Sequence, residues 1–243
     1  MARKKNSGGF GETIRTVVYA VLIAAVIRTF AYEPFNIPSG SMKPTLLIGD
    51  YLFVSKFSYG YSHFSLPFSP NLFSGRIFGG EPQRGDVVVF KLPTDGKTDY
   101  IKRIVGLPGD TIQVVHGILN INGTPVTREE VAPFTDEDGR SYTRYVETLP
   151  NGVKHPILEQ GDDEDLDNTQ PYKVPPGHYF AMGDNRDNSR DSRVTDEVGY
   201  VPAENLIGRA EFLFFSTDGS AGWLEPWNWF GAIRYDRLFQ AVR

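Results

Sequence analysis

The sequence predicts a mainly β protein that carries one transmembrane helix at its N-terminus. Three observations lead to this fold class. A single long apolar run, residues 16–27, lies near the N-terminus. From Asp50 onward, short runs rich in β-branched and aromatic residues alternate with turn residues. Helical periodicity is scarce after the apolar run, so we expect antiparallel sheets arranged as a barrel or as coiled sheets.

Composition excludes several classes of function. With 243 residues, 40% of them hydrophobic, the chain can bury a core in one large or two modest domains. Its net charge of −5 and the lack of a long basic tract argue against nucleic acid as a partner. Cysteine is absent, which removes disulfides and thiolate sites. No metal site and no cofactor are expected, because no two of the histidines have metal-ligand spacing, these being His63, His116, His155 and His178.

The N-terminal segment has two interpretations. Residues 1–13 begin with a basic stretch, and residues 14–32 are long enough to span a bilayer if Arg15 and Arg28 reach opposite interfaces. A cleaved secretory signal would have a similar basic start and apolar run. We favour an uncleaved anchor, because cleavage near Ala31 would leave the following segment without a tether. The basic end should then stay in the cytoplasm, with everything after Tyr32 outside.

The body of the chain divides by composition. Residues 33–123 and 177–243 are expected to form one β-rich core, and the more polar residues 124–176 an inserted smaller β region. Asn122-Gly123 is a strong hairpin turn signal. Strands are expected at residues 51–57, 86–92, 100–106, 111–117, 118–121, 178–183 and 206–215.

Four further segments are expected to lie outside the strands, at the membrane or in water. Residues 59–80 form an aromatic loop without periodicity, whose expected neighbour is the membrane. The acidic runs at residues 135–139 and 162–165 lack the alternating ligands of an EF-hand, so we interpret them as solvated loops. The aromatic cluster near the C-terminus is either core or an interfacial belt, and we favour membrane contact for at least one of Trp223, Trp227 and Trp229.

A candidate nucleophile lies in residues 38–46, which begin six residues after Tyr32. Pro38 and Pro44 restrict the backbone on either side of Ser41, so that this serine can occupy a rigid, exposed turn. A serine hydroxyl needs a base within hydrogen-bond reach and donors aimed at the developing oxyanion.

The candidate base is either a histidine or a lysine. None of the four histidines lies in a segment with other catalytic signals. Lys102 lies in the β-run of residues 99–106, where alternation places it on the face opposite its neighbour Arg103. Burial in such a strand would lower the pKa of a lysine by several units. Alternatively, both cations are simply surface charges on a half-buried strand.

The sequence resembles bacterial type I signal peptidases over most of its length. Four segments after the anchor are similar to that family's boxes, in the family's order: residues 38–46, residues 49–60, residues 84–90 together with 100–110, and residues 183–193. The resemblance implies a Ser/Lys-dyad serine protease with Ser41 as nucleophile and Lys102 as general base. It implies that the Ser39 hydroxyl and the Ser41 backbone N–H form the oxyanion hole, and that Ser189 orients the lysine amine.

Further roles follow from the same resemblance. Asp191 and Arg193 match an ion pair that supports the site, and Arg103 follows the lysine as in the family. The family's shallow apolar pockets for small side chains fall on Ile37, Met42, Leu46 and Ile101. Some members have two membrane segments before the serine, whereas this chain has room for one.

The implied function is that of a membrane-bound endopeptidase that cleaves signal peptides from exported preproteins through an acyl-enzyme. Its expected partners are signal peptides with small residues before the cleavage site and the lipid bilayer. The expected location is the bacterial cytoplasmic membrane, with the catalytic domain on the extracytoplasmic side. Two alternatives remain: a non-catalytic anchored β-module that binds extracytoplasmic peptides, and a Ser/Lys protease acting on another membrane-bound substrate.

Overall fold

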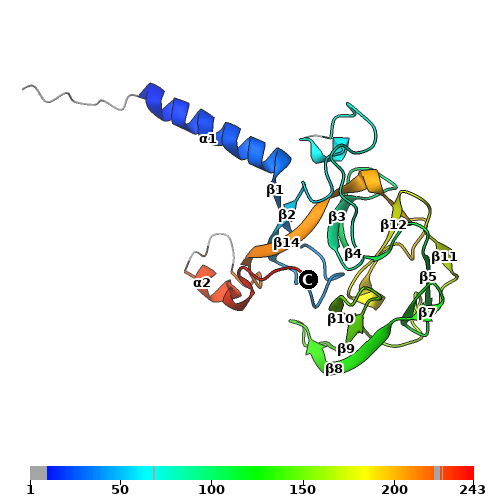
Figure 1. The fold of residues 1–243 in the computed structure, drawn as a ribbon. Coiled ribbons are helices and arrows are strands. Elements are labelled where there is room, and N and C mark those ends of the chain that lie inside the picture. The colour runs from blue at the N-terminus through cyan, green and yellow to red at the C-terminus, as the bar shows by residue number, and fades with distance from the viewer. Residues whose placement is uncertain (1–9, 68, 222–224, 226) are drawn as a thin grey trace, which may run out of the picture.

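A long N-terminal helix projects from a β-rich body (Figure 1). The structure, a computed structural model, describes residues 10–67, 69–221, 225 and 227–243. Helix α1 (Phe10–Phe30) has no buried residue, and it is the one helix among the described residues that is long and apolar enough to cross a membrane. The helix lies earlier in the chain than the expected span of residues 14–32, because Tyr32 already belongs to the first strand.

The largest sheet has seven strands and carries residues from both ends of the body. Every strand pair in it is antiparallel. From edge to edge the order is β1 (Tyr32–Asn36), β2 (Asp50–Ser55), β14 (Leu206–Ser216), β3 (Val87–Lys91), β4 (Asp99–Gly106), β12 (His178–Met182) and β13 (Val201–Pro202). β14, near the C-terminus, thus pairs between β2 and β3, two strands from the first half of the chain.

Two smaller antiparallel sheets lie between β4 and β12 in the sequence. Asn122 and Gly123 both have positive φ angles, of 54° and 78°, as the hairpin signal requires. One sheet has the order β11 (Tyr172–Lys173), β5 (Thr111–Val115), β6 (Ile118–Ile121) and β7 (Thr124–Pro125). The other has the order β10 (Lys154–Glu159), β9 (Ser141–Thr148) and β8 (Thr127–Thr135). The composition change at residue 124 therefore falls inside a hairpin rather than between two sheets.

The expectation of a mainly β protein with antiparallel sheets and one N-terminal apolar helix is confirmed. After α1 the described helices are short, namely η1 (His63–Ser65), η2 (Arg186–Asn188), η3 (Ala203–Asn205), α2 (Trp229–Ala232) and η4 (Tyr235–Arg237). β3 is buried over its first four residues, as a continuous apolar run at the centre of a sheet should be.

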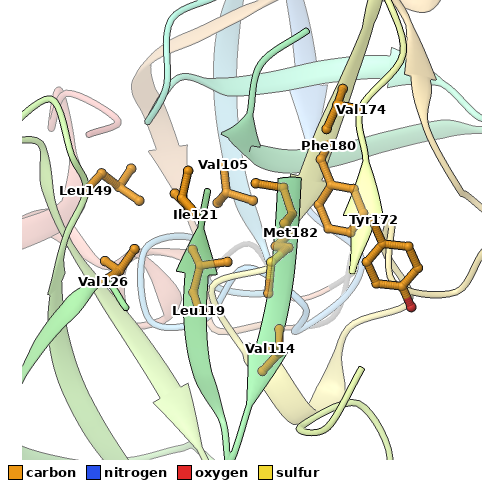
Figure 2. Packing of buried hydrophobic residues seen from close by; sticks show 11 residues of the cluster. Val105, Val114, Leu119, Ile121, Val126, Leu149, Tyr172, Val174, Phe180 and Met182 are labelled. Atoms are coloured by element: carbon orange, nitrogen blue, oxygen red, sulfur yellow. The ribbon is translucent and has the colours of Figure 1, made fainter. Parts of the chain in front are cut away.

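Apolar side chains join the sheets into one body. Figure 2 shows Val105 of β4 and Met182 of β12 packed beside Leu119 and Ile121 of β6, so the large sheet and the four-stranded sheet share a core. A second cluster lies under the loop between β1 and β2 and includes Leu52, Val54, Val87 and Val89. This second cluster supports the loop that carries Ser41.

The aromatic loop of residues 59–80 is held to the body mainly by Arg76. The Arg76 guanidinium donates hydrogen bonds of 2.6–3.0 Å to four backbone carbonyls, those of Tyr59, Gly60, Ala203 and Leu206. It also donates to the Glu204 carbonyl. Tyr61 donates to the Phe30 carbonyl at 2.6 Å, which places the loop at the end of α1. Leu72 and Phe78 remain 75% and 87% exposed. Of the C-terminal tryptophans, Trp227 and Trp229 are exposed, and Trp223 lies outside the described residues.

Candidate active site

Ser41 lies in the turn that connects β1 to β2. Backbone hydrogen bonds from Lys43 to Gly40, of 3.1 Å, and from Leu46 to Met42, of 2.9 Å, fold this turn back on itself. The side chains of Met42 and Leu46 are 0% exposed and pack into the second core cluster. Ser41 itself is half-buried, so its hydroxyl lies at the surface of a turn that the core holds in place.

A second loop, residues 183–193, clamps the Ser41 turn from the other side. Asn185 donates its backbone N–H to the Ser41 carbonyl at 3.1 Å and its side-chain amide to the Gly40 carbonyl at 3.0 Å. Gly183 comes so close that an added Cβ would lie 2.5 Å from the Ser41 carbonyl oxygen. Only glycine fits there without displacing the Ser41 backbone.

Lys102 meets Ser41 from strand β4. Lys102 pairs with Val88 of β3, and the residues that follow it, from Arg103 on, pair with β12, which holds the strand in place. Lys102 is 3% exposed. The Lys102 Nζ atom lies 2.7 Å from Ser41 Oγ and 3.0 Å from the Ile101 carbonyl oxygen. In the described part of the chain, no histidine hydrogen-bonds to the Ser41 hydroxyl, so the lysine is the base within reach.

Burial changes the protonation of this amine. Removal from water lowers the pKa of Lys102 to about 8, against the opposing influence of the Asp191 and Asp184 carboxylates. At pH 7 a lysine of ordinary pKa is neutral in about 0.03% of molecules, whereas one with a pKa near 8 is neutral in about 9%. The same shift costs about 3 kcal/mol of favourable charging, which the packing around the strand must supply.

The influence of Asp191 on the charged amine is partly offset by the partner of Asp191, Arg193. Arg193 donates to both carboxylate oxygens of Asp191 at 2.9 Å, and both residues are buried. Although burial alone would raise it, the pKa of Asp191 is lowered by Arg193. The expected ion pair is thus present, and the positive charge of Arg193 also lowers the pKa of Lys102.

Ser39 and Ser189 occupy different positions at the site: Ser39 lies beside the Ser41 hydroxyl, and Ser189 is buried in the 183–193 loop. Ser39 Oγ is 3.5 Å from Ser41 Oγ, so its hydroxyl faces the same space. Ser189 is buried against Gly183, where an added Cβ would lie 2.2 Å from its Oγ. The family resemblance implies that Ser189 orients the Lys102 amine. Among the described residues, however, Ser189 makes no hydrogen bond to Lys102. The conformation instead places Ser189 close enough to Asp191 to help lower the pKa of that carboxyl.

A cavity of about 530 Å³ opens beside the dyad. Ile37 and Ile101 contribute apolar walls, and Asn188 and Arg190 form part of its polar rim. Ser39, Ser41 and Lys102 all line this cavity, so a peptide bound in it would pass the Ser41 hydroxyl. Met42 and Leu46, which were also expected to line pockets, do not line this cavity because their side chains are buried in the core below it.

A buried ionic network, which the sequence did not reveal, supports the Lys102 strand. Arg103 donates to both oxygens of Asp184 at 2.7 and 2.8 Å, and both side chains are almost fully buried. Thr45, four residues after the nucleophile, donates to the same carboxylate at 2.5 Å. His155 lies between Asp184, at 3.4 Å, and Glu147, at 3.2 Å. The network therefore ties the nucleophile turn, the base strand and the three-stranded sheet together.

The dyad is not accompanied by a set of metal ligands. Within the described part of the chain, the single group of three clustered His or carboxylate side chains is formed by other residues, Glu159, Asp167 and Asp187. The arrangement of hydroxyl, neutral amine and apolar cavity can activate an alcohol for attack on a carbonyl without a metal ion.

Comparisons with known proteins point to one family. The family model for signal peptidases, peptidase S26, matches residues 10–215. The chain is 44% identical over 245 residues to a signal peptidase I of Rickettsia canadensis (strain McKiel), an alignment that covers 93% of this chain and 91% of the relative. It is also 44% identical to a signal peptidase I of Rickettsia typhi (strain ATCC VR-144 / Wilmington), over 94% of this chain and 92% of that relative.

A solved structure is similar at lower coverage. A crystal structure of a signal peptidase I from Enterococcus faecalis V583 is 26% identical and covers 54% of this chain and 97% of that chain. Its TM-score is 0.32, an overlap too low for the two folds to be compared element by element.

The Arg103–Asp184 pair gives a stability prediction. Asp184→Asn should lower the free energy of unfolding by about 3–5 kcal/mol, because it leaves the Arg103 guanidinium buried without its counter-charge. Urea unfolding of the detergent-solubilised chain measures this change. The exposed Asp163→Asn variant is the control and should stay within about 0.5 kcal/mol of the wild type. Equal unfolding midpoints for Asp184→Asn and wild type would contradict the account.

The same pair predicts a pH dependence. Although burial alone would raise it, Arg103 holds the pKa of Asp184 well below its usual range. The stabilisation is therefore fully present above the unfolded-state pKa of about 3.9, and it is lost as the pH falls toward the folded-state value. The wild type should lose stability below about pH 4, and Asp184→Asn should lose less over the same interval.

Proposed function

The chain belongs to the signal peptidase family, peptidase S26, and from this premise we propose that it cleaves signal peptides from exported preproteins with Ser41 as nucleophile and Lys102 as general base. The observation that carries this proposal is the 2.7 Å contact between Lys102 Nζ and Ser41 Oγ in a site where the lysine is 3% exposed. Both requirements of a serine nucleophile, proximity to a base and a base that is partly neutral, are then met by one side chain.

The reaction would proceed in two halves. The neutral Lys102 amine takes the proton of Ser41 as Oγ attacks the scissile carbonyl carbon. The resulting ammonium gives this proton to the leaving amine, the peptide bond breaks, and the signal peptide stays attached to Ser41 as an ester. The amine then takes a proton from water, whose oxygen attacks the ester. Return of the proton to Ser41 Oγ releases the signal peptide as a free carboxylate.

The oxyanion of each tetrahedral intermediate needs donors that are already in place. We assign this role to the backbone N–H of Ser41 and to the Ser39 hydroxyl. Ser39 Oγ lies 3.5 Å from the attacking oxygen, which is compatible with a donor to the adjacent carbonyl oxygen. Donors of this type contribute about 3–4 kcal/mol each to stabilisation of the transition state.

The cavity supports a preference for small side chains. An extended peptide that lies along the wall formed by Ile37 and Ile101 would bring its scissile bond to Ser41. Because the cavity is lined by residues of the Ser41 turn and of β4, whose backbones are held by hydrogen bonds, bulky side chains next to the scissile bond would meet walls that do not move aside. Selectivity for small residues before the cleavage site then comes mainly from exclusion.

The proposed location is the bacterial cytoplasmic membrane, with α1 as a single anchor and the β body on the extracytoplasmic side. The exposed apolar side chains of the 59–80 loop lie at the body end of α1, to which Tyr61 is joined. Exposed apolar side chains, here including the aromatic ring of Phe78, are stabilised by contact with the interfacial region of a bilayer. The body would therefore rest close to the surface from which a signal peptide emerges.

Removal of either member of the dyad should abolish cleavage. Ser41→Ala and Lys102→Met should each lower kcat/KM for a preprotein by about 1,000-fold or more, because they remove the nucleophile or its base. Circular dichroism and thermal unfolding should show that both variants fold. Lys97→Met, which removes an exposed lysine, is the matched control and should cleave normally. Normal cleavage by Ser41→Ala or by Lys102→Met would rule out the dyad.

The rate should follow titration of the lysine. Since the active form is the neutral amine and burial lowers the pKa of Lys102 to about 8, kcat/KM should rise almost tenfold per pH unit below about pH 7.5 and level off above about pH 8.5. Cleavage of a peptide substrate between pH 5.5 and 10 measures this profile. A rate that is independent of pH, or that keeps rising to pH 10, would be inconsistent with a buried neutral lysine.

Membrane contact can be tested with the tryptophans. In vesicles that contain brominated lipids, fluorescence of the full chain should be quenched relative to unbrominated vesicles, because at least one C-terminal tryptophan reaches the interface. Trp227→Phe should reduce the quenching, since Trp227 is 73% exposed. Unchanged fluorescence in both kinds of vesicle would count against membrane contact by this segment.

A further inference from the structure

Three carboxylates that have no part in the proposed reaction meet where the three-stranded sheet reaches the 183–193 loop. Glu159 ends strand β10, Asp167 lies in the loop that follows, and Asp187 lies in η2. One carboxylate oxygen from each lies within 4.8 Å of the corresponding atoms of the other two. Two of the three come from the region of residues 124–176, and the third comes from the loop that clamps Ser41.

The carboxylates are buried without the donors that buried carboxylates normally have. Glu159 is 2% exposed, and neither of its oxygens accepts a hydrogen bond within the described part of the chain. Asp167 is 0% exposed, and its Oδ1 atom likewise has no hydrogen-bond partner there. The other Asp167 oxygen accepts from the Glu164 backbone at 2.8 Å. A buried carboxylate with free oxygens is costly unless a counter-charge or a ligand compensates it.

The positive charges nearby compensate the three carboxylates only in part. Arg128 forms an ion pair with Glu159 at 3.5 Å, without a hydrogen bond, and lies closer to Asp162, at 2.7 Å. Arg186 binds both oxygens of Glu147, at 2.6 and 3.0 Å, and Arg193, whose charge acts on Asp167, binds Asp191. Each of these three guanidinium groups thus has a closer carboxylate partner outside the cluster, which leaves the three clustered carboxylates with excess negative charge.

We propose that Glu159, Asp167 and Asp187 form a binding site for a calcium ion that joins the end of β10 to the 183–193 loop. Calcium binds oxygen ligands at 2.3–2.6 Å, so two of its ligands can be up to about 5.2 Å apart. The three carboxylate oxygens, all within 4.8 Å of one another, are close enough to share one such ion. Magnesium demands near-ideal octahedral geometry at 2.0–2.1 Å and dehydrates reluctantly, so a cage of protein carboxylates suits it less well than it suits calcium.

Access and remaining ligands are consistent with such a site. Asp187 is half-buried and borders the exposed Gln160, whose backbone N–H it accepts at 2.5 Å, so the ion can enter from this side and keep water ligands. Without the ion, burial raises the pKa of Glu159 to about 9 and also raises the pKa of Asp167. Binding would therefore displace protons and strengthen as the pH rises.

The consequence would be a stiffer support for the proposed catalytic loop. The end of β10 already runs beside that loop, where Leu158 donates to the Asp184 carbonyl at 2.8 Å. Asp187 lies two residues before Ser189 and four before Asp191. A calcium ion bound to Asp187 would connect this loop to Glu159 and Asp167 by bonds that do not depend on the dyad. The proposed site stands apart from the peptidase reaction and was not indicated by sequence spacing.

Calcium binding can be measured on the full chain in detergent after treatment with EDTA. With 10 mM CaCl2 the wild type should unfold about 3–8 °C higher, if its Kd lies in the 0.1–1 mM range of extracellular calcium modules. Equilibrium dialysis with radioactive calcium should give one ion per chain, and 10 mM MgCl2 should displace little of it. Glu159→Gln and Asp167→Asn should each weaken binding at least tenfold, whereas Asp165→Asn, in the exposed acidic run, should leave it unchanged.

The alternatives give different results. Absence of bound calcium in dialysis of the wild type at 10 mM would overturn the proposal, whatever the variants do. Binding that Asp165→Asn weakens as much as Glu159→Gln would assign it to the exposed acidic run and would also overturn the proposal. If Glu159→Gln does not fold, the proposal is tested by the calcium affinity of Asp167→Asn and by the number of calcium ions bound per wild-type chain. A thermal shift that follows pH but not calcium would indicate carboxylates that share protons instead.

Discussion

The structure depends on keeping one amine out of water next to one alcohol. Lys102 is held on a central strand whose neighbours on both sides fix its backbone, and Ser41 is held on a turn fixed by core packing. Neither group would be reactive alone, because the free lysine is charged and the free serine is a poor nucleophile. Their 2.7 Å contact in a buried site changes both properties together.

Such a site needs surroundings that exclude water and yet balance charge. The chain solves this by pairing each nearby charge with a partner other than the amine: Asp191 with Arg193, and Asp184 with Arg103. An unpaired carboxylate at either position would favour the ammonium form of Lys102. The Arg103–Asp184 pair also connects the 183–193 loop to the Lys102 strand, and the Thr45 hydroxyl joins the same carboxylate to the Ser41 turn, so that at Asp184 charge balance and positioning have a common origin.

Local sequence was sufficient for the apolar strands, missed β1 and the polar strands β8, β9 and β10, and was insufficient for the contacts between elements. The apolar run of β3 and the Asn122-Gly123 turn were predictable, because period and turn chemistry act over a few residues. Lys102 could be selected by its strand context together with the family resemblance. By contrast, Thr45 and Asp184 are 139 residues apart, and His155 reaches Glu147 and Asp184 only after three segments have folded together. No periodicity records such pairs, and the burial of Met42 and Leu46 below the cavity was hidden for the same reason.

The most direct test of the central claim is the protonation of Lys102 itself. With lysines labelled at 13Cε, NMR spectra of the intact chain in detergent can be followed between pH 6 and 11, and the Lys102→Arg variant identifies its resonance. Because burial lowers its pKa, the Lys102 resonance should titrate near pH 8, well below the ordinary lysine value of about 10.5. A Lys102 resonance that titrates near the ordinary lysine value of about 10.5 would show that burial does not lower its pKa, and the proposed role of Lys102 as base would be untenable.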